Sequence, residues 1–213
     1  MRLYLSSFRN GNKPDELLKL LGPGRRTALI QNAQDMLSVE ERKASLGQEM
    51  ERLKSIDLKV TEVDLRAYFG RPEALKQDLA SYDLVWIRGG NAFVLRRAFK
   101  QSGADTVIPE LLAEDRIVYS GYSAGIDMLT PSLHGVELVD NPHVVPEGYD
   151  PAIIWDCLGL LPYAVAPHYK SDHPESAAID KSVDYLIDHH VPFIALRDGE
   201  AIVIDGDEQK VVG

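Results

Sequence analysis

The chain has 213 residues, of which 45% are hydrophobic and 26% charged, values that are ordinary for one globular domain with a buried core. Its formal net charge of -10 argues against nucleic acid or an anionic membrane as a partner, because both call for a basic surface. No apolar run approaches the ~20 residues of a membrane helix, and the first residues lack the layout of a signal peptide. The single cysteine, Cys157, excludes an internal disulfide and a multi-thiolate metal site, so we expect a cytoplasmic protein.

From the N-terminus to the middle of the chain, short apolar runs alternate with longer stretches of helical periodicity. The expected strands are residues 2–8, 27–31, 58–65, 83–87 and 116–119, and the expected helices are residues 14–21, 38–56, 72–82 and 91–101, with 107–113 as a continuation of the last. Ser38 and Glu41 have the spacing of a capping box at a helix start. Strands follow one another about every 25 to 30 residues with helices between them, which predicts a three-layer, doubly wound, mostly parallel α/β sheet.

The pattern changes after Met128. Residues 133–148 contain glycines and prolines with little periodicity, so we expect a loop or a short hairpin there. Asp205-Gly206 is the expected turn of a C-terminal hairpin. The remaining expected elements are a helix at 174–190 and strands at 161–167, 193–196, 201–204 and 210–212. No repeat or linker interrupts the chain, and we expect a single domain over residues 1–213.

The most informative stretch is Gly121-Tyr122-Ser123-Ala124-Gly125, which follows an apolar run of strand length. Two glycines flank a serine at the spacing of a nucleophile elbow, in which a strand turns sharply into a helix and leaves the serine accessible. Such a turn requires small neighbours, and the free N–H group of Ala124 would be available to an oxyanion. A plain Gly/Ser turn between a strand and a helix explains the same residues equally well.

A nucleophilic serine needs a base, and six histidines are available. His168 follows an apolar strand, so it lies where a parallel sheet presents its functional side chains. A histidine that only bonds to backbone at a strand end is the structural alternative. His173 precedes a proline and a helix and is a candidate supporting group, whereas the other four lie in the irregular loop or at a helix end.

Asp198 is the expected acid, because it follows another apolar run and precedes a glycine. A tight Asp-Gly turn explains the same pair, and Asp172 and Asp156 are competing acids. We expect Ser123, His168 and Asp198 to lie at strand ends along the same edge of one sheet.

The segment Arg88-Gly89-Gly90-Asn91 breaks a strand and starts a helix, with Asn91 as its N-cap. Glycine lets the backbone approach a ligand closely and direct N–H groups at it, so this turn is a candidate source of a second oxyanion donor, with an ordinary strand-to-helix turn as the alternative. A dinucleotide site is disfavoured because the third glycine of that fingerprint is missing. His168 and His173 do not form a recognised metal motif, and we expect neither a metal nor another cofactor.

Three segments in this order resemble the peptidase E family: Gly89-Gly90-Asn91-Ala92-Phe93, Gly121-Tyr122-Ser123-Ala124-Gly125 and Pro167-His168-Tyr169. The likeness covers nearly the whole chain. The family consists of serine peptidases, alpha-aspartyl dipeptidases, on a flavodoxin-like fold similar to class I glutamine amidotransferases. The resemblance implies that Ser123 is the nucleophile, His168 the base and Asp198 the acid. It also implies that Gly90 and Ala124 are the two oxyanion donors. The order Ser, His, acid agrees with that fold, whereas α/β-hydrolases run Ser, acid, His.

Some members of that family have glutamate where Asp198 stands and tryptophan where Tyr122 stands. The resemblance also implies substrates with an N-terminal aspartate, whose carboxylate would need a cation. The candidate substrate-binding residues near the three segments are Arg88, Lys170, Arg197, Asn91 and Tyr122.

The expected partner is a short peptide, and the sequence is compatible with a homodimer. The alternatives are a tripeptidase or aminopeptidase, a cyanophycinase-like hydrolase of beta-aspartyl bonds, or a non-catalytic binding protein of the same fold.

Overall fold

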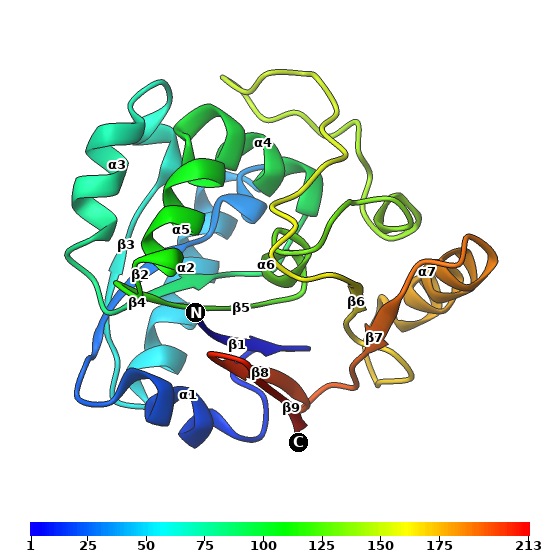
Figure 1. The fold of residues 1–213 in the computed structure, drawn as a ribbon. Helices are drawn as coiled ribbons and strands as arrows, with labels where there is room; N and C mark the ends of the chain where they lie inside the picture. Colours follow the sequence, from blue (N-terminus) through cyan, green and yellow to red (C-terminus); the bar gives the residue numbers. More distant parts are fainter.

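The structure, a computed structural model, describes all residues from 1 to 213. Its main sheet has seven strands in the order β3-β2-β4-β5-β1-β8-β9 (Figure 1). The strands are β1 (Arg2–Ser6), β2 (Arg26–Ile30), β3 (Lys59–Glu62), β4 (Leu84–Ile87), β5 (Val118–Tyr122), β6 (Ala164–Ala166), β7 (Phe193–Ala195), β8 (Ala201–Asp205) and β9 (Glu208–Val212). The helices are α1 (Pro14–Leu21), α2 (Val39–Lys54), α3 (Pro72–Leu79), α4 (Ala92–Ser102), α5 (Ala104–Ala113), α6 (Ala124–Asp127) and α7 (Ser176–Asp188). Three 3-10 turns are η1 (Asn32–Gln34), η2 (Leu65–Tyr68) and η3 (Val136–Leu138).

The main sheet is parallel over five strands and antiparallel at one edge. Strands β3, β2, β4, β5 and β1 run parallel, whereas β8 pairs antiparallel with β1, and β9 pairs antiparallel with β8. The helices between the parallel strands cover both faces of this sheet (Figure 1). The predicted three-layer, doubly wound, mostly parallel architecture is therefore confirmed, and it is consistent with a flavodoxin-like fold.

Each face of the main sheet has its own hydrophobic core, because successive strand residues point to opposite faces. Leu3 and Leu5 of β1 belong to the larger core, under α3, α4, α5 and α6. Tyr4, between them, belongs to the smaller core under α1 and α2. Ser38 and Glu41 form the predicted capping box at the start of α2. None of the helices combines the length and the apolar composition that crossing a membrane requires.

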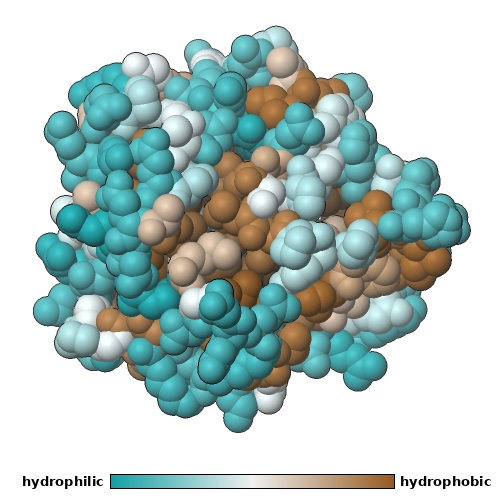
Figure 2. Space-filling view, viewed as in Figure 1, coloured by the Kyte–Doolittle hydropathy of each residue, from teal (hydrophilic) through white to brown (hydrophobic).

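Strands β6 and β7 form a second, two-stranded parallel sheet, separate from the main one. Figure 1 shows this pair and α7 beside the main body of the molecule. In the same view hydrophilic residues cover the rim of the molecule, and hydrophobic residues gather toward its middle and right (Figure 2). The expectation that Ser123, His168 and Asp198 follow strands at the edge of one sheet is wrong, because β5 lies in the main sheet and β6 and β7 do not.

One expected helix differs from the structure for a local reason, and the irregular segment after Met128 is resolved as a loop. Residues 107–113 do not continue α4 but belong to the separate helix α5, because Gly103 between the two adopts the left-handed conformation at φ 79°. Residues 133–148, for which a loop or a short hairpin is expected, form a loop that contains only the turn η3. This segment packs across the N-terminus of α4, where Asp140 accepts a hydrogen bond from the backbone N–H of Ala92 at 2.7 Å.

Candidate active site

Ser123 lies on a strained turn at the end of the central strand β5. Its backbone has φ 51° and ψ -122°, a conformation that costs a non-glycine residue about 1–3 kcal/mol. A Cβ atom at Gly121 or at Gly125 would lie 2.6 Å from the carbonyl oxygen of Ile87, so glycine is required on both sides. The flanking glycines are thus explained by the close approach of β4, as an elbow requires. The following helix α6 has only four residues, so its dipole is small.

His168 and Asp198 form a hydrogen-bonded pair. Their parent strands β6 and β7 are aligned so that Ala166 faces Ala195, which brings the residues after each strand together. Nδ1 of His168 lies 2.7 Å from Oδ1 of Asp198, and the histidine is only 1% exposed. Since the carboxylate accepts the hydrogen on Nδ1, Nε2 keeps its lone pair and is free to accept a proton.

Ser7, which sequence reasoning missed, holds this pair in place. Its hydroxyl donates to Oδ1 of Asp198 at 2.8 Å and accepts from the backbone N–H of His168 at 2.8 Å. The backbone of His168 is itself in the left-handed region at φ 59°. One serine hydroxyl at the end of β1 therefore fixes both the backbone of the histidine and the oxygen that orients its ring.

Ser123 and His168 line the same cavity of about 160 Å³. Gly89 forms another part of its wall, and a Cβ atom there would lie 3.0 Å from Cβ of Ser123. Gly90 has φ 150° and packs against η1, where a Cβ atom would lie 2.5 Å from the carbonyl oxygen of Ala33. The full lining is Phe8, Gln34, Arg88, Gly89, Gly90, Tyr122, Ser123, His168, His173 and Glu175.

The imidazole of His168 is enclosed by aromatic rings. His173 stacks on it with 3.7 Å between ring centroids and 6° between ring planes, and Phe8 contacts both rings edge-on. Burial lowers the pKa of His168 below its ordinary 6.5, and a cationic His173 would lower it further, while Asp198 opposes both. Glu175 lies at the open side, with Oε2 3.9 Å from Nε2 of His168. The histidine is therefore held in its neutral form at neutral pH.

A second, smaller cavity of about 20 Å³ adjoins Ser123 and is lined by three carboxyl groups, those of Asp127, Asp140 and Glu175. Burial raises the pKa of Asp140 to about 7 and is the main cause of this shift. Burial also raises the pKa of Asp127 well above its usual range. Glu175 adds repulsion to both. Sequence reasoning did not select these acids, although the position of Asp127 on the elbow helix was a signal that could have found it.

The predicted cations divide into one residue at the cavity and two outside it. Arg88 lines the larger cavity, where Nε lies 3.3 Å from Oε2 of buried Glu49 and the buried Nη1 has no partner. Lys170 points to Asp180 on the surface, with 2.7 Å between Nζ and Oδ2. Arg197 is exposed and lines neither cavity beside Ser123.

Of the other predicted residues, Tyr122 lines the larger cavity and Asn91 does not. The hydroxyl of Tyr122 donates to Glu49 at 3.1 Å, which turns it toward the core. Asn91 caps α4 by accepting from the backbone N–H of Val94, and its amide nitrogen donates to a backbone carbonyl of the 133–148 segment. Cys157 is a free thiol whose pKa burial raises to about 12, in agreement with an unreactive side chain.

A cluster of three potential metal ligands coincides with the histidine pair. The donor atoms of His168, His173 and Asp198 lie within 4.8 Å of one another. The two imidazole planes are stacked, so their in-plane lone pairs run side by side instead of converging on one point. The Nδ1 atoms are also engaged, in His168 by Asp198 and in His173 by the backbone N–H of Glu175. These donors fit hydrogen bonding better than metal coordination.

A strained serine on the central strand beside a histidine–carboxylate pair is an arrangement typical of hydrolases that use a nucleophilic side chain. Comparison with known proteins defines the class further. The model of peptidase family S51 matches residues 10–212, and the chain belongs to this family.

Similar proteins have names that refer to peptidases. The chain is 27% identical over 143 residues to a Drosophila melanogaster protein named "Probable alpha-aspartyl dipeptidase", covering 65% of this chain and 56% of that protein. It is 29% identical to peptidase E of Streptomyces coelicolor over 62% of this chain and 52% of that protein. These two matches thus span little more than half the length of those relatives. Peptidase E of Shewanella denitrificans is 26% identical over 99% of this chain and 87% of its own length.

The fold is shared with a solved structure. A crystal structure of a Listeria monocytogenes protein named for peptidase E superimposes with a TM-score of 0.79. The match covers 99% of this chain and 97% of that one at 23% sequence identity. At this level of identity the likeness supports the fold, and the chemistry rests on the residues of the site.

Proposed function

We propose that the chain is a serine exopeptidase that hydrolyses short peptides, with Ser123 as nucleophile, His168 as general base and Asp198 as the acid that orients it. The observation that supports this most is that the strained Ser123 and the buried His168–Asp198 pair open on one cavity. Gly90 and Ala124 are the proposed oxyanion donors. The N–H of Gly90 donates to no other group of the protein, and that of Ala124 opens a helix, where N–H groups lack intrahelical partners.

In the proposed mechanism Nε2 of His168 takes the proton of Ser123 as the serine oxygen attacks the peptide carbonyl. The tetrahedral oxyanion is held by the N–H groups of Gly90 and Ala124. His168, now cationic and stabilised by Asp198, gives the proton to the leaving amine, so that an acyl-enzyme remains. Water, deprotonated by His168, then attacks the ester and releases the acid product with Ser123 restored.

The small acidic cavity suits the free N-terminal ammonium of a peptide. It has room for about one group of water size, and Asp127, Asp140 and Glu175 surround it next to Ser123. An ammonium group bonded there favours the ionised form of Asp140, whose pKa of about 7 in the empty site is raised by burial. A substrate anchored in this way presents its first peptide bond to Ser123, as an exopeptidase requires.

We propose that the preferred substrates are dipeptides with an N-terminal aspartate and that Arg88 contacts the aspartate side chain. The name of the Drosophila relative supports this, and Arg88 is the one arginine or lysine that lines either cavity beside Ser123. Its buried Nη1 has no hydrogen-bond partner, so a carboxylate would provide one.

Arg88→Gln is expected to lower kcat/KM for Asp-Leu by about tenfold to a hundredfold, because a hydrogen bond to a charged group contributes about 1.5–3 kcal/mol. Lys170→Gln and Arg197→Gln should leave it unchanged, since neither residue lines the cavity. The measurement is hydrolysis of Asp-Leu, Ala-Leu, Asp-containing tripeptides and beta-aspartyl peptides by each variant. Equal wild-type turnover of Ala-Leu and Asp-Leu would contradict the aspartate preference and favour a broader aminopeptidase.

The pH dependence should separate the base from the ammonium site. Both His168 and Asp140 act in their deprotonated forms, so kcat/KM is expected to fall as the pH decreases below about 7, the pKa of Asp140. It should fall more steeply at lower pH, where His168, whose pKa burial lowers, becomes protonated. Bound substrate keeps Asp140 ionised, so the pH profile of kcat should show only the decrease at lower pH that protonation of His168 causes. In Asp140→Asn the limb near pH 7 should disappear from kcat/KM while KM rises. A kcat/KM profile that is unchanged in Asp140→Asn would remove that residue from the ammonium site.

A further inference from the structure

The peptide unit between Gly89 and Gly90 has two ends with different partners. Its N–H, on Gly90, is the proposed oxyanion donor and has no partner within the protein. Its carbonyl oxygen, on Gly89, accepts a hydrogen bond from Nε2 of Gln34 at 3.0 Å. Because the two groups belong to one planar unit, the partner of the carbonyl fixes the direction of the N–H. A flip of this peptide would break the bond to Gln34.

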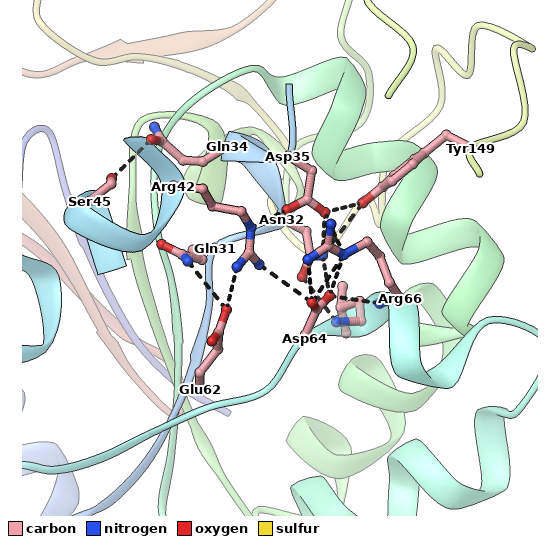
Figure 3. A network of polar contacts seen from close by, with 11 residues as sticks. Gln31, Asn32, Gln34, Asp35, Arg42, Ser45, Glu62, Asp64, Arg66 and Tyr149 are labelled. Atoms are coloured by element: carbon pink, nitrogen blue, oxygen red, sulfur yellow. Dashed lines mark hydrogen bonds and ion pairs between the residues drawn. The ribbon is translucent and has the colours of Figure 1, made fainter. Parts of the chain in front are cut away.

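The side-chain amide of Gln34 is itself held in one orientation. Ser45 of α2 donates its hydroxyl hydrogen to Oε1 of Gln34 at 3.1 Å (Figure 3). Nε2 of Gln34 is therefore the atom that donates to Gly89. A hydrogen bond accepted by the carbonyl also polarises the peptide, so that its N–H becomes a better donor. Gln34 lines the cavity that contains Ser123, so it lies beside the reacting atoms.

The turn η1, which contains Gln34, is fixed to the Gly89–Gly90 turn and to the protein core. The backbone N–H of Asn91 donates to the carbonyl of Ala33 at 2.9 Å. Directly after η1, the fully buried carboxylate of Asp35 pairs with Nε of Arg42 at 2.6 Å and accepts from Tyr149 (Figure 3). These buried contacts of Asp35 restrain the segment, so the backbone that carries Gln34 is held in place.

We propose that Gln34 is a positioning residue for the reaction, which holds the Gly89–Gly90 peptide with its N–H toward the oxyanion. The inference rests on the proposed function and adds a side chain to it. Without the amide, the peptide is free to rotate, and its N–H no longer stabilises the tetrahedral state in full. Binding of the substrate ground state needs this N–H much less, so the effect belongs to kcat.

Gln34→Met keeps the volume and removes both polar groups, and Gln34→Glu keeps an acceptor for Ser45 but places a carboxylate against the Gly89 carbonyl. Removal of a whole oxyanion donor lowers turnover by about 10²–10³-fold, so we expect kcat to fall about tenfold to a hundredfold in Gln34→Met, with KM within about twofold. Gln34→Glu should lose more, and Ser45→Ala a few-fold. The affinity for a peptide aldehyde, which forms a tetrahedral adduct, should fall by the same factor as kcat.

Gln31→Met is the matched control, since Gln31 lies just before η1, is buried and lines neither cavity. It should show a comparable loss of thermal stability with normal kcat. The acid limb of the kcat profile should not move in Gln34→Met, because His168 is untouched. If the wild type is active and Gln34→Met keeps the same kcat and the same affinity for the aldehyde, this inference is overturned while the proposed function stands. A wild-type protein that neither hydrolyses peptides nor reacts with a fluorophosphonate overturns it together with the proposed function.

Discussion

Replacing Ser123 with alanine is expected to lower the turnover of dipeptides by roughly five to six powers of ten, as loss of the nucleophile does in serine peptidases. Without the hydroxyl no acyl-enzyme forms, and only binding and the oxyanion donors remain to promote attack by water. Substrate affinity should change little, because the ammonium cavity and Arg88 are intact. The measurement is the rate of Asp-Leu hydrolysis, together with mass analysis after exposure to a fluorophosphonate, which should label Ser123 in the wild type alone.

Ser120→Ala is the matched control for this variant. Ser120 is three residues earlier on β5, is fully buried and donates to the carbonyl of Tyr4 at 2.7 Å. Its loss removes a hydrogen bond from the same strand without touching the cavity, so stability should fall by about 1 kcal/mol while turnover is kept. Near-normal hydrolysis by Ser123→Ala would exclude Ser123 as the nucleophile, and a large loss in Ser120→Ala would point to damage of the strand.

The elbow and the framework of strands around it could be predicted from the sequence because their signals are local. Gly121 and Gly125 flank Ser123 within one pentapeptide, and the apolar runs that form β1, β2, β4 and β5 are each contiguous in the chain. Steric exclusion by the carbonyl of Ile87 explains why both glycines are needed. Where a single short segment determines the geometry, periodicity and turn residues were sufficient.

The contacts that hold His168 in place could not be predicted, because they join segments that lie far apart in the sequence. Ser7 meets His168 and Asp198 across more than 160 residues, and no local pattern marks a serine for that position. The position of Glu175 beside His168 depends on how the second sheet and α7 sit against β5. The sequence could not distinguish a separate parallel sheet of β6 and β7 from two further strands of the main sheet. Both arrangements give short apolar runs in the sequence.

Gln34 and Asp140 show the same limit at the proposed oxyanion-donor and ammonium sites. Each belongs to a segment without strong periodicity, and each acquires its contact through space, Gln34 with Gly89 and Asp140 with the N-terminus of α4. Burial then changes the chemistry of Asp140 by raising its pKa to about 7, which composition cannot reveal. The sequence therefore indicates the residues that we propose react more clearly than those that we propose position them.

Asp198→Asn is expected to lower kcat by roughly 10³–10⁴-fold, as loss of the orienting carboxylate does in a serine triad. The amide is neutral, so it no longer stabilises the imidazolium of His168, and its NH₂ group can turn toward Nδ1 and favour the wrong tautomer. Asp198→Glu keeps the charge and should retain much more activity. The competing acids predicted from the sequence are tested by Asp172→Asn and Asp156→Asn, which should remain within a few-fold of the wild type.

The pH profile distinguishes loss of the acid from a general loss of structure. Asp198 raises the pKa of His168 against the effect of burial, so its removal should lower that pKa further and move the acid limb of kcat to lower pH. A misfolded site would lose rate without this shift. A loss of tenfold or less in Asp198→Asn, with the limb unmoved, would transfer the role to another carboxylate. Glu175, with Oε2 3.9 Å from Nε2 of His168, faces the proton-accepting nitrogen and not Nδ1, so it is better placed to bind substrate than to replace Asp198.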